Sequence, residues 1–313
     1  MRARSLFYQQ IRAFFAQRDV LEVDTPILAA APVTDPNIEP MQTIEGRWLH
    51  TSPEYAMKRL LCAGSGDIWQ LCKVFRAGEA GSKHNPEFSM LEWYRVGWDH
   101  HQLMDEVRDL VRVLFQPRWQ NIPEMRLSYA QAFTQYAGID VHHVHDDVLH
   151  AKGIELAGQD LELNRDGWLD IIMSHLIEPS LPTNTLVFID AFPASQAALA
   201  KITYDENGIA VAQRFELFFN GTELANGYYE LTDAAEQRRR FNNDARVAGG
   251  RKVDERLLEA LESGLPECAG VAMGIAGTSR PCSGACHEIS HAIDLLFPDR
   301  TKPHGEQVGM GAL

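Results

Sequence analysis

The chain has 313 residues, of which 45% are hydrophobic, and its formal net charge is −14. It is long enough for one large domain or two small ones, and its acidic balance argues against broad binding to a nucleic-acid backbone, which needs Lys and Arg. There is no apolar run of ~18 residues, no signal-peptide core and no paired cysteine framework, so we expect a cytoplasmic protein without a membrane span.

The N-terminal region predicts a helix over residues 5–18, with an apolar face formed by Phe7, Ile11, Phe14 and Phe15. A short alternating strand follows over 20–28, and Pro26 within it cannot donate to a strand ladder. Residues 49–54 predict a strand end and a turn before a helix over 54–63, with Pro53 in its first turn. Ser52 is a candidate cap of that helix.

Residues 67–94 predict two strands joined by a polar loop rich in turn-forming residues. Alternation places Arg76 at the end of the first strand, and it places Phe88, Met90, Glu92 and Tyr94 on one face of the second. The Arg76 guanidinium could fork onto a phosphate, and Phe88 could stack on a base. Taken alone, this segment also fits an ordinary antiparallel hairpin with a solvated loop.

The remaining elements alternate between helices and strands. Helices are predicted over 100–115, 128–137, 234–248 and 254–263, and 140–182 is a mostly helical insertion. Strands are predicted over 185–192, 268–274 and on both sides of Asn220-Gly221, a strong hairpin signal. The histidines and aspartates of 142–147 lack the separated spacing of a closed metal site, so we interpret them as solvated.

Glu223 and Glu230 lie in the second strand of that hairpin. Their spacing would send them to opposite faces of a regular strand. For both to reach one site, the chain must bend, and Asn226-Gly227 is where we expect the bend. Without a bend, the segment is a strand with two exposed carboxylates.

Several separated segments together resemble the class II aminoacyl-tRNA synthetases. Residues 75–94, with Phe75-Arg76, His84-Asn85-Pro86-Glu87-Phe88 and Met90-Leu91-Glu92-Trp93-Tyr94, resemble motif 2 of the lysyl branch. Residues 20–28 resemble motif 1, 223–231 the matching lysyl-branch segment, and 268–274 the start of motif 3. Within that branch, the chain is most similar to the paralogous ligases that attach β-lysine to a lysine of elongation factor P.

The resemblance implies an α+β fold, a class II synthetase-like catalytic core with an antiparallel β-sheet flanked by helices. The core would span residues 1–275 and include the insertion 140–182, and motif 1 would build a homodimer. The implied reaction is ATP-dependent activation of (R)-β-lysine as an adenylate, with Mg²⁺, followed by transfer to elongation factor P.

The resemblance also implies roles for individual residues. Arg76 would be catalytic and would hold the α-phosphate of ATP. ATP would further contact Glu79, Asn85, Phe88, Glu223, Leu224 and Gly274. The amino acid would contact Ser52, Glu54, Tyr94, Asn226, Glu230 and Ala272. Mg²⁺ would be bound by Glu223 and Glu230.

Two departures from the family pattern matter. Gly78 stands where lysyl-tRNA synthetases have Glu, and Glu79 is one position later. In motif 3 the family continues through Asp-Arg into an apolar helix, whereas Gly277 stands at the arginine position here. Residues 276–313 therefore resemble a frame-shifted translation of the missing helix, and we interpret them as an aberrant tail.

Two alternatives remain open at this stage. The chain has no room before motif 1 for an anticodon-binding barrel, which disfavours tRNA as the acyl acceptor, but a truncated lysyl-tRNA synthetase would share all the motifs. A catalytically silent relative that binds a nucleotide or a protein partner is the other reading, and the broken motif 3 favours it.

Overall fold

The computed structural model describes residues 2–77, 86–116 and 121–275. Glu79, Asn85 and the tail 276–313, for which the sequence made predictions, lie outside the described residues. No described helix is both long and apolar enough to cross a bilayer.

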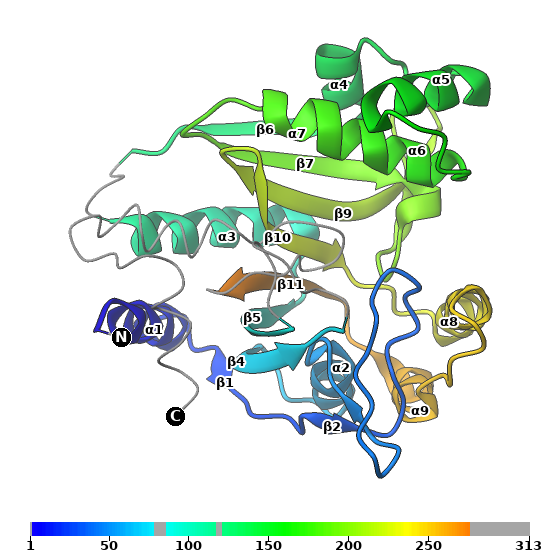
Figure 1. Cartoon of the computed structure of the whole chain (residues 1–313). Helices are drawn as coiled ribbons and strands as arrows, with labels where there is room; N and C mark the ends of the chain where they lie inside the picture. Colours follow the sequence, from blue (N-terminus) through cyan, green and yellow to red (C-terminus); the bar gives the residue numbers. More distant parts are fainter. Residues whose placement is uncertain (1, 78–85, 117–120, 276–313) are drawn as a thin grey trace.

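A nine-stranded sheet organises the fold (Figure 1), in the order β1-β4-β5-β11-β10-β9-β7-β6, with β8 also paired to β9. The strands are β1 Leu21–Glu22, β4 Ile68–Phe75, β5 Glu87–Val96, β6 Glu124–Ser128, β7 Leu186–Pro193, β8 Ile202–Tyr204, β9 Ala210–Phe219, β10 Thr222–Tyr229 and β11 Cys268–Ile275. Neighbours from β4 to β7 are antiparallel, and only the outer pairs β1–β4 and β6–β7 are parallel. The α+β fold and the antiparallel sheet core are confirmed. A second, two-stranded sheet pairs β2 Leu28–Ala29 with β3 Trp48–Leu49.

One face of the large sheet is covered by α1 Arg2–Ala16 and α3 His100–Phe115. The apolar face predicted for the first helix is confirmed, because Phe7, Ile11, Phe14 and Phe15 are all buried in this layer. Helix α3 begins with a complete capping box between Asp99 and Gln102, which satisfies backbone N–H groups that would otherwise lack a partner.

The opposite face carries two separate groups of helices (Figure 1). The helices at one end belong to the predicted insertion and the segment just before it. They are α4 Tyr129–Ala132, the π-helix Phe133–Ala137, α5 Asp146–Ala157, α6 Arg165–Ile172, the π-helix Met173–Ile177 and α7 Glu178–Ser180. A 3-10 turn, Ala194–Gln196, follows β7. At the other end lie α2 Glu54–Cys62, α8 Ala234–Val247 and α9 Glu255–Gly264. Between the two groups the sheet presents polar residues, among them Glu92, Asn226 and Glu216. These lie in one row across the sheet, with Ala272 of β11 between Glu92 and Asn226.

The β9–β10 hairpin confirms the turn predicted from Asn220-Gly221. Both residues have positive φ, 52° and 72°, as the tight turn of a two-residue hairpin requires. The prediction for the bend in β10 is wrong in position. The register shifts between Glu223 and Ala225, so Leu224 is the extra residue of a β-bulge, and its side chain is buried in the layer under α3.

The bulge decides which side chains face the site. Beyond it, Asn226 pairs with Glu216 and Tyr228 with Arg214, while Glu223 before it pairs with Phe218. Paired residues in neighbouring strands share a face, so Glu223, Asn226 and Tyr228 all point to the polar face.

Candidate active site

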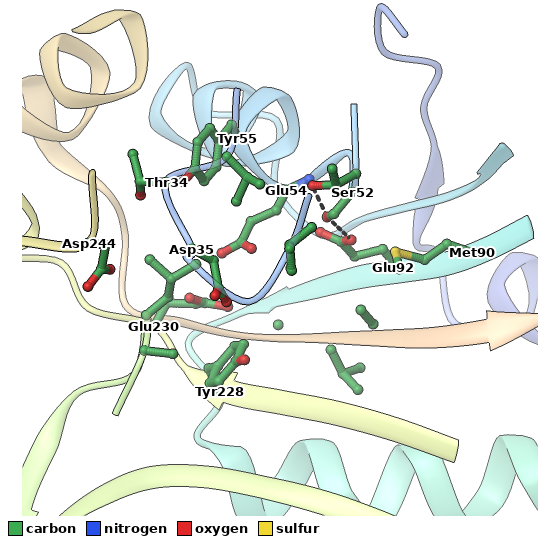
Figure 2. A pocket seen from close by; sticks show the side chains of 18 of the residues that line it. Thr34, Asp35, Ser52, Glu54, Tyr55, Met90, Glu92, Tyr228, Glu230 and Asp244 are labelled. Carbon is green, nitrogen blue, oxygen red and sulfur yellow. Dashed lines mark hydrogen bonds between the residues drawn. The ribbon is translucent and has the colours of Figure 1, made fainter. Parts of the chain in front are cut away.

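A cavity open to solvent lies on the polar face of the sheet, where β5 and β11 meet α2, α8 and the segment 33–38 (Figure 2). Among its lining residues are Ser52, Glu54, Arg76, Tyr94, Glu230 and Ala272, all of which were predicted from the sequence. The structure therefore brings all of the predicted amino-acid residues except Asn226 to one cavity, together with the motif 2 arginine, from separate stretches of chain.

Glu92 is the centre of a buried hydrogen-bond network in the cavity wall. Ser52 donates its hydroxyl to Glu92 Oε2 at 2.6 Å, and Tyr94 donates to Glu92 Oε1 at 2.7 Å. Burial, followed by repulsion from Glu54, raises the pKa of Glu92 to about 8, and the two hydroxyl donors oppose this rise. Ser52 also accepts a hydrogen bond from the Glu54 backbone N–H in the turn before α2. The N-cap of that helix is Pro53, with no side-chain cap, so the predicted capping role of Ser52 is wrong.

Glu54 and Glu230 share one cation. The Lys58 ammonium lies 2.6 Å from Glu54 Oε1 and 2.7 Å from Glu230 Oε2, and only 3% of the Lys58 side chain is exposed. Burial raises the pKa of Glu230 to about 7 although Lys58 opposes the rise. Glu230 is accommodated because Gly270 lies opposite it: a Cβ there would sit 2.4 Å from Glu230 Oε1.

Arg76 also lines the cavity, and its side chain is buried to 1% exposure. Its guanidinium donates to the Thr51 carbonyl oxygen at 3.3 Å and lies 5.3 Å from the centre of the Phe88 ring. Phe88 is itself buried against Val74 and Met90 and does not line the cavity. Adenine can therefore stack on Phe88, as predicted, only if the Arg76 guanidinium moves off the Phe88 ring or if the base approaches that ring from the side.

Glu223, Leu224, Asn226 and Gly274 do not line the cavity in this conformation. Glu223 and Asn226 are neighbours on the polar face, and Asn226 donates from Nδ2 to Glu216 Oε1 at 2.9 Å while its buried Oδ1 has no partner among the described atoms. A carboxylate beside an amide oxygen is a donor set that suits Mg²⁺.

Glu230 lies too far from Glu223 and Asn226 to be part of the same metal site. Because a strand rises ~3.3 Å per residue, the backbones of Glu223 and Glu230 lie roughly 20 Å apart, too far for both carboxylates to bind one ion at ~2.1 Å. The expected joint binding of a single Mg²⁺ by this pair does not fit the geometry, and Glu230 instead pairs with Lys58.

Sequence reasoning missed several groups of the cavity. Lys58 follows Glu54 by one helical turn, a spacing that predicts an ion pair on the helix itself, and Glu92 alternates with Tyr94 along β5. Asp35 and Asp244 also line the cavity, yet they come from a loop and from α8, and nothing local in the sequence signals their meeting. Burial raises the pKa of both carboxyl groups.

The balance of charge in the cavity identifies the kind of ligand it fits. Five carboxylates, those of Asp35, Glu54, Glu92, Glu230 and Asp244, line it, while Arg76 is its lining cation and Lys58 stands behind the wall. Buried carboxylates are stabilised by cationic partners, so these carboxyl groups suit a ligand with ammonium groups. The guanidinium of Arg76 suits a phosphate.

A separate group of possible metal ligands lies on the other face of the sheet, outside this cavity. His100, His101 and Asp190 bring ligand atoms within 4.8 Å of one another. His100 and His101 form the first turn of α3, whose dipole places partial positive charge there. That field disfavours a bound cation, and we do not assign this group to the site.

Comparison with known proteins gives a consistent result. A family model described as tRNA synthetases class II (D, K and N) matches residues 1–286. The chain is 46% identical over 315 residues to the elongation factor P--(R)-beta-lysine ligase of Vibrio vulnificus (strain YJ016), with 95% of each chain covered. It is 44% identical over 289 residues to the protein of the same name from Histophilus somni (strain 2336), with 87% of each covered.

Proposed function

The chain belongs to the family of class II tRNA synthetases (D, K and N), and from this premise we propose that it is an ATP-dependent ligase that activates (R)-β-lysine and transfers it to a lysine of elongation factor P. The observation that carries the proposal is the buried carboxylate pocket around Glu54, Glu92 and Glu230, because it complements a diamine. Relatives that share 44–46% of their residues with this chain bear the corresponding name.

The proposed first step is attack of the β-lysine carboxylate on the α-phosphorus of ATP. A bond forms from the carboxylate oxygen to phosphorus, the bond to the leaving pyrophosphate breaks, and the products are an acyl adenylate and pyrophosphate. Arg76 would hold the α-phosphate and stabilise the charge that develops on it. An ionised carboxylate needs no general base.

In the proposed second step the acceptor lysine, as a free amine, attacks the acyl carbon. An amide bond forms, AMP leaves with the electron pair of the acyl–oxygen bond, and the amine loses a proton to solvent. Ser52, Glu54, Tyr94 and Glu230 orient the bound amino acid through both steps, which converts a bimolecular encounter into a positioned one.

Cofactor and nucleotide contacts complete the proposal. Mg²⁺, when bound, would neutralise phosphate charge, and Glu223 with the Oδ1 of Asn226 would hold it. Phe88, Leu224 and Gly274 remain proposed ATP contacts, Leu224 through its backbone because its side chain is buried in the core.

The test is ATP–pyrophosphate exchange with each lysine isomer. We expect β-lysine to stimulate exchange more than α-lysine, because Ala272 places a methyl group in the cavity wall where lysyl-tRNA synthetases have glycine. One methyl group in a tight pocket can change the discrimination between two substrates by ~1–3 kcal/mol. Equal or greater stimulation by α-lysine would refute the assignment. Exchange with neither isomer would support the catalytically silent alternative.

The acceptor is tested separately by label transfer. Radiolabelled β-lysine and ATP are incubated with elongation factor P, with tRNA, or with both. We expect label on elongation factor P, since the net charge of −14 gives little attraction for a nucleic-acid backbone. Label mainly on tRNA would instead support a lysyl-tRNA synthetase activity.

A further inference from the structure

Lys58 lies behind the wall of the cavity and joins two elements that are far apart in the sequence. It stands one turn after Glu54 on α2, and its ammonium also reaches Glu230, just beyond the end of β10. With 3% of its side chain exposed, the ammonium depends on these two carboxylates in place of water. A buried cation of this kind is stable only when its partners stay ionised.

We propose that Lys58 is a positioning residue of the amine subsite, which favours the ionised form of Glu230 and aims the carboxylates of Glu54 and Glu230 so that their remaining oxygens receive an ammonium group of the substrate. This inference rests on the proposed function and deepens it, because it names the residue that prepares the carboxylates for a cationic amino acid.

The contact atoms support this arrangement. Lys58 uses Oε1 of Glu54 and Oε2 of Glu230, so the second oxygen of each carboxylate is directed elsewhere. For Glu230 that oxygen, Oε1, lies over Gly270, which lines the cavity and has no Cβ to cover it. Figure 2 shows the carboxylates of Glu54 and Glu230 turned toward the cavity.

The charges around Lys58 explain why it is needed. Burial raises the pKa of Glu230 to about 7, Lys58 lowers it and Glu54 raises it further. Burial works against the charge of Lys58, yet the carboxylates of Glu230 and Glu54 raise the pKa of its ammonium well above the usual value. The other titratable groups that act on this cluster are Glu92, Tyr55, Tyr94, Cys62 and Cys268. Without Lys58, Glu230 should therefore hold a proton at neutral pH and accept an ammonium poorly.

The experiment measures β-lysine binding by calorimetry from about pH 6.5 to about pH 8.5 in the whole chain and in Lys58→Met and Lys58→Arg. At about pH 7 we expect Lys58→Met to bind roughly 10- to 100-fold more weakly, which corresponds to a rise of one to two units in the pKa of Glu230. The loss should diminish as the pH rises and the carboxylates ionise. Lys58→Arg keeps the charge and should retain most of the affinity and the original pH profile.

Two readouts separate a positioning role from a merely structural one. Binding of a non-hydrolysable ATP analogue should be unchanged in Lys58→Met, because Lys58 pairs with Glu54 and Glu230, which are proposed contacts of the amino acid and not of ATP. In addition, ¹³C NMR titration of the Glu230 side-chain carboxyl group, assigned with Glu230→Gln, should show a raised pKa in Lys58→Met.

The inference is overturned if the carboxyl titration is unchanged in Lys58→Met, or if the affinities for β-lysine and nucleotide fall together with no recovery at higher pH. If Lys58→Met does not fold, the comparison of the whole chain with Lys58→Arg and Lys58→Gln decides, and equal pH profiles in all three refute the inference. The proposed function fails independently, through absent exchange or transfer by the unaltered chain, and the carboxyl titration then still tests Lys58.

Discussion

At the scale of single residues, the site depends on buried carboxylates whose charge is controlled by their neighbours. Glu92 accepts two hydroxyl hydrogen bonds, Glu230 accepts an ammonium, and Gly270 leaves room beside Glu230 and the Tyr94 ring. Because Glu92 and Glu230 have different partners and Gly270 provides space, single substitutions should change hydrogen bonding, charge or available space one at a time.

Gly270→Ala should weaken β-lysine binding more than nucleotide binding. The new Cβ would meet Tyr94 Cε1 at 2.3 Å and Glu230 Oε1 at 2.4 Å, so it displaces two proposed substrate contacts, and overpacking of this kind costs ~1–3 kcal/mol of stability. Calorimetry with each ligand measures the effect. Ala269→Gly, on the adjacent residue in the opposite layer, is the control for lost stability, and an unaltered affinity for β-lysine in Gly270→Ala would contradict the arrangement.

As the pH rises, the free energy of unfolding of the Glu92→Gln variant should increase relative to that of the unaltered chain. The pKa of Glu92 is raised to about 8 in the fold, so its protonated form stabilises the native state below the unfolded pKa of ~4.5, and that contribution is lost as the pH rises through about 8. Gln does not titrate, so the difference in free energy of unfolding should grow by at most ~1.4 kcal/mol per pH unit.

Urea unfolding from about pH 5 to about pH 9 measures that difference. Glu87→Gln, in the exposed first position of the same strand, serves as the control and should show no comparable trend. A difference between Glu92→Gln and the unaltered chain that stays constant across this range would show that Glu92 does not titrate as described.

At the scale of elements, the wall of the cavity opposite the sheet includes a loop that the Arg251 side chain helps to hold. Arg251, in the linker between α8 and α9, donates to the carbonyl oxygens of Asp35 at 2.7 Å and Ile38 at 2.6 Å, and its guanidinium also pairs with Glu39 at 2.7 Å. The loop residues Val33–Ile38 contribute Asp35 and other lining residues. The linker therefore positions part of the cavity without reaching into it.

Arg251→Ala should loosen this loop and weaken β-lysine binding severalfold, because the freed carbonyl groups lose their shared donor. Hydrogen exchange of the amides at 33–39 should accelerate by about tenfold or more, as expected for a local opening. Arg246→Ala is the matched control, since Arg246 bonds Asn243 within its own helix. Unchanged exchange at 33–39 would mean that other contacts hold the loop.

At the scale of the whole molecule, the resemblance of residues 20–28 to motif 1 leads us to propose a homodimer through this segment. The structure leaves apolar side chains exposed there: Leu21 is 56% exposed, Ile27 41% and Leu28 52%. Leu21 lies in the short edge strand β1. An exposed edge with apolar side chains is a common place for another chain to pack.

The double variant Leu21→Glu/Leu28→Glu should therefore be monomeric while the unaltered chain is a dimer, because burying two added charges in an interface is costly. Light scattering coupled to size-exclusion chromatography gives the mass directly. Circular dichroism must show an unchanged fold, which is expected because both side chains are already exposed. A dimer of undiminished stability in the double variant would place the interface elsewhere.

The sequence by itself determined the elements and much of the site. The helix at 100–115, the Asn220-Gly221 hairpin and the alternating face of Phe88, Met90, Glu92 and Tyr94 depend on residues close in the chain, and the structure confirms them. Family motifs added Ser52, Glu54, Arg76, Tyr94, Glu230 and Ala272, which meet at one cavity.

Only the tertiary structure decided how the carboxylates are distributed and held. It placed the irregularity of β10 at Leu224, where a core position was available for the extra side chain, and not at Asn226-Gly227. It also placed Glu223 far from Glu230, and it paired Glu230 with the Lys58 ammonium. These pairings depend on the register between strands that are distant in the sequence, and on which buried charged groups come into contact. The periodicity of a short stretch of sequence carries no information about either.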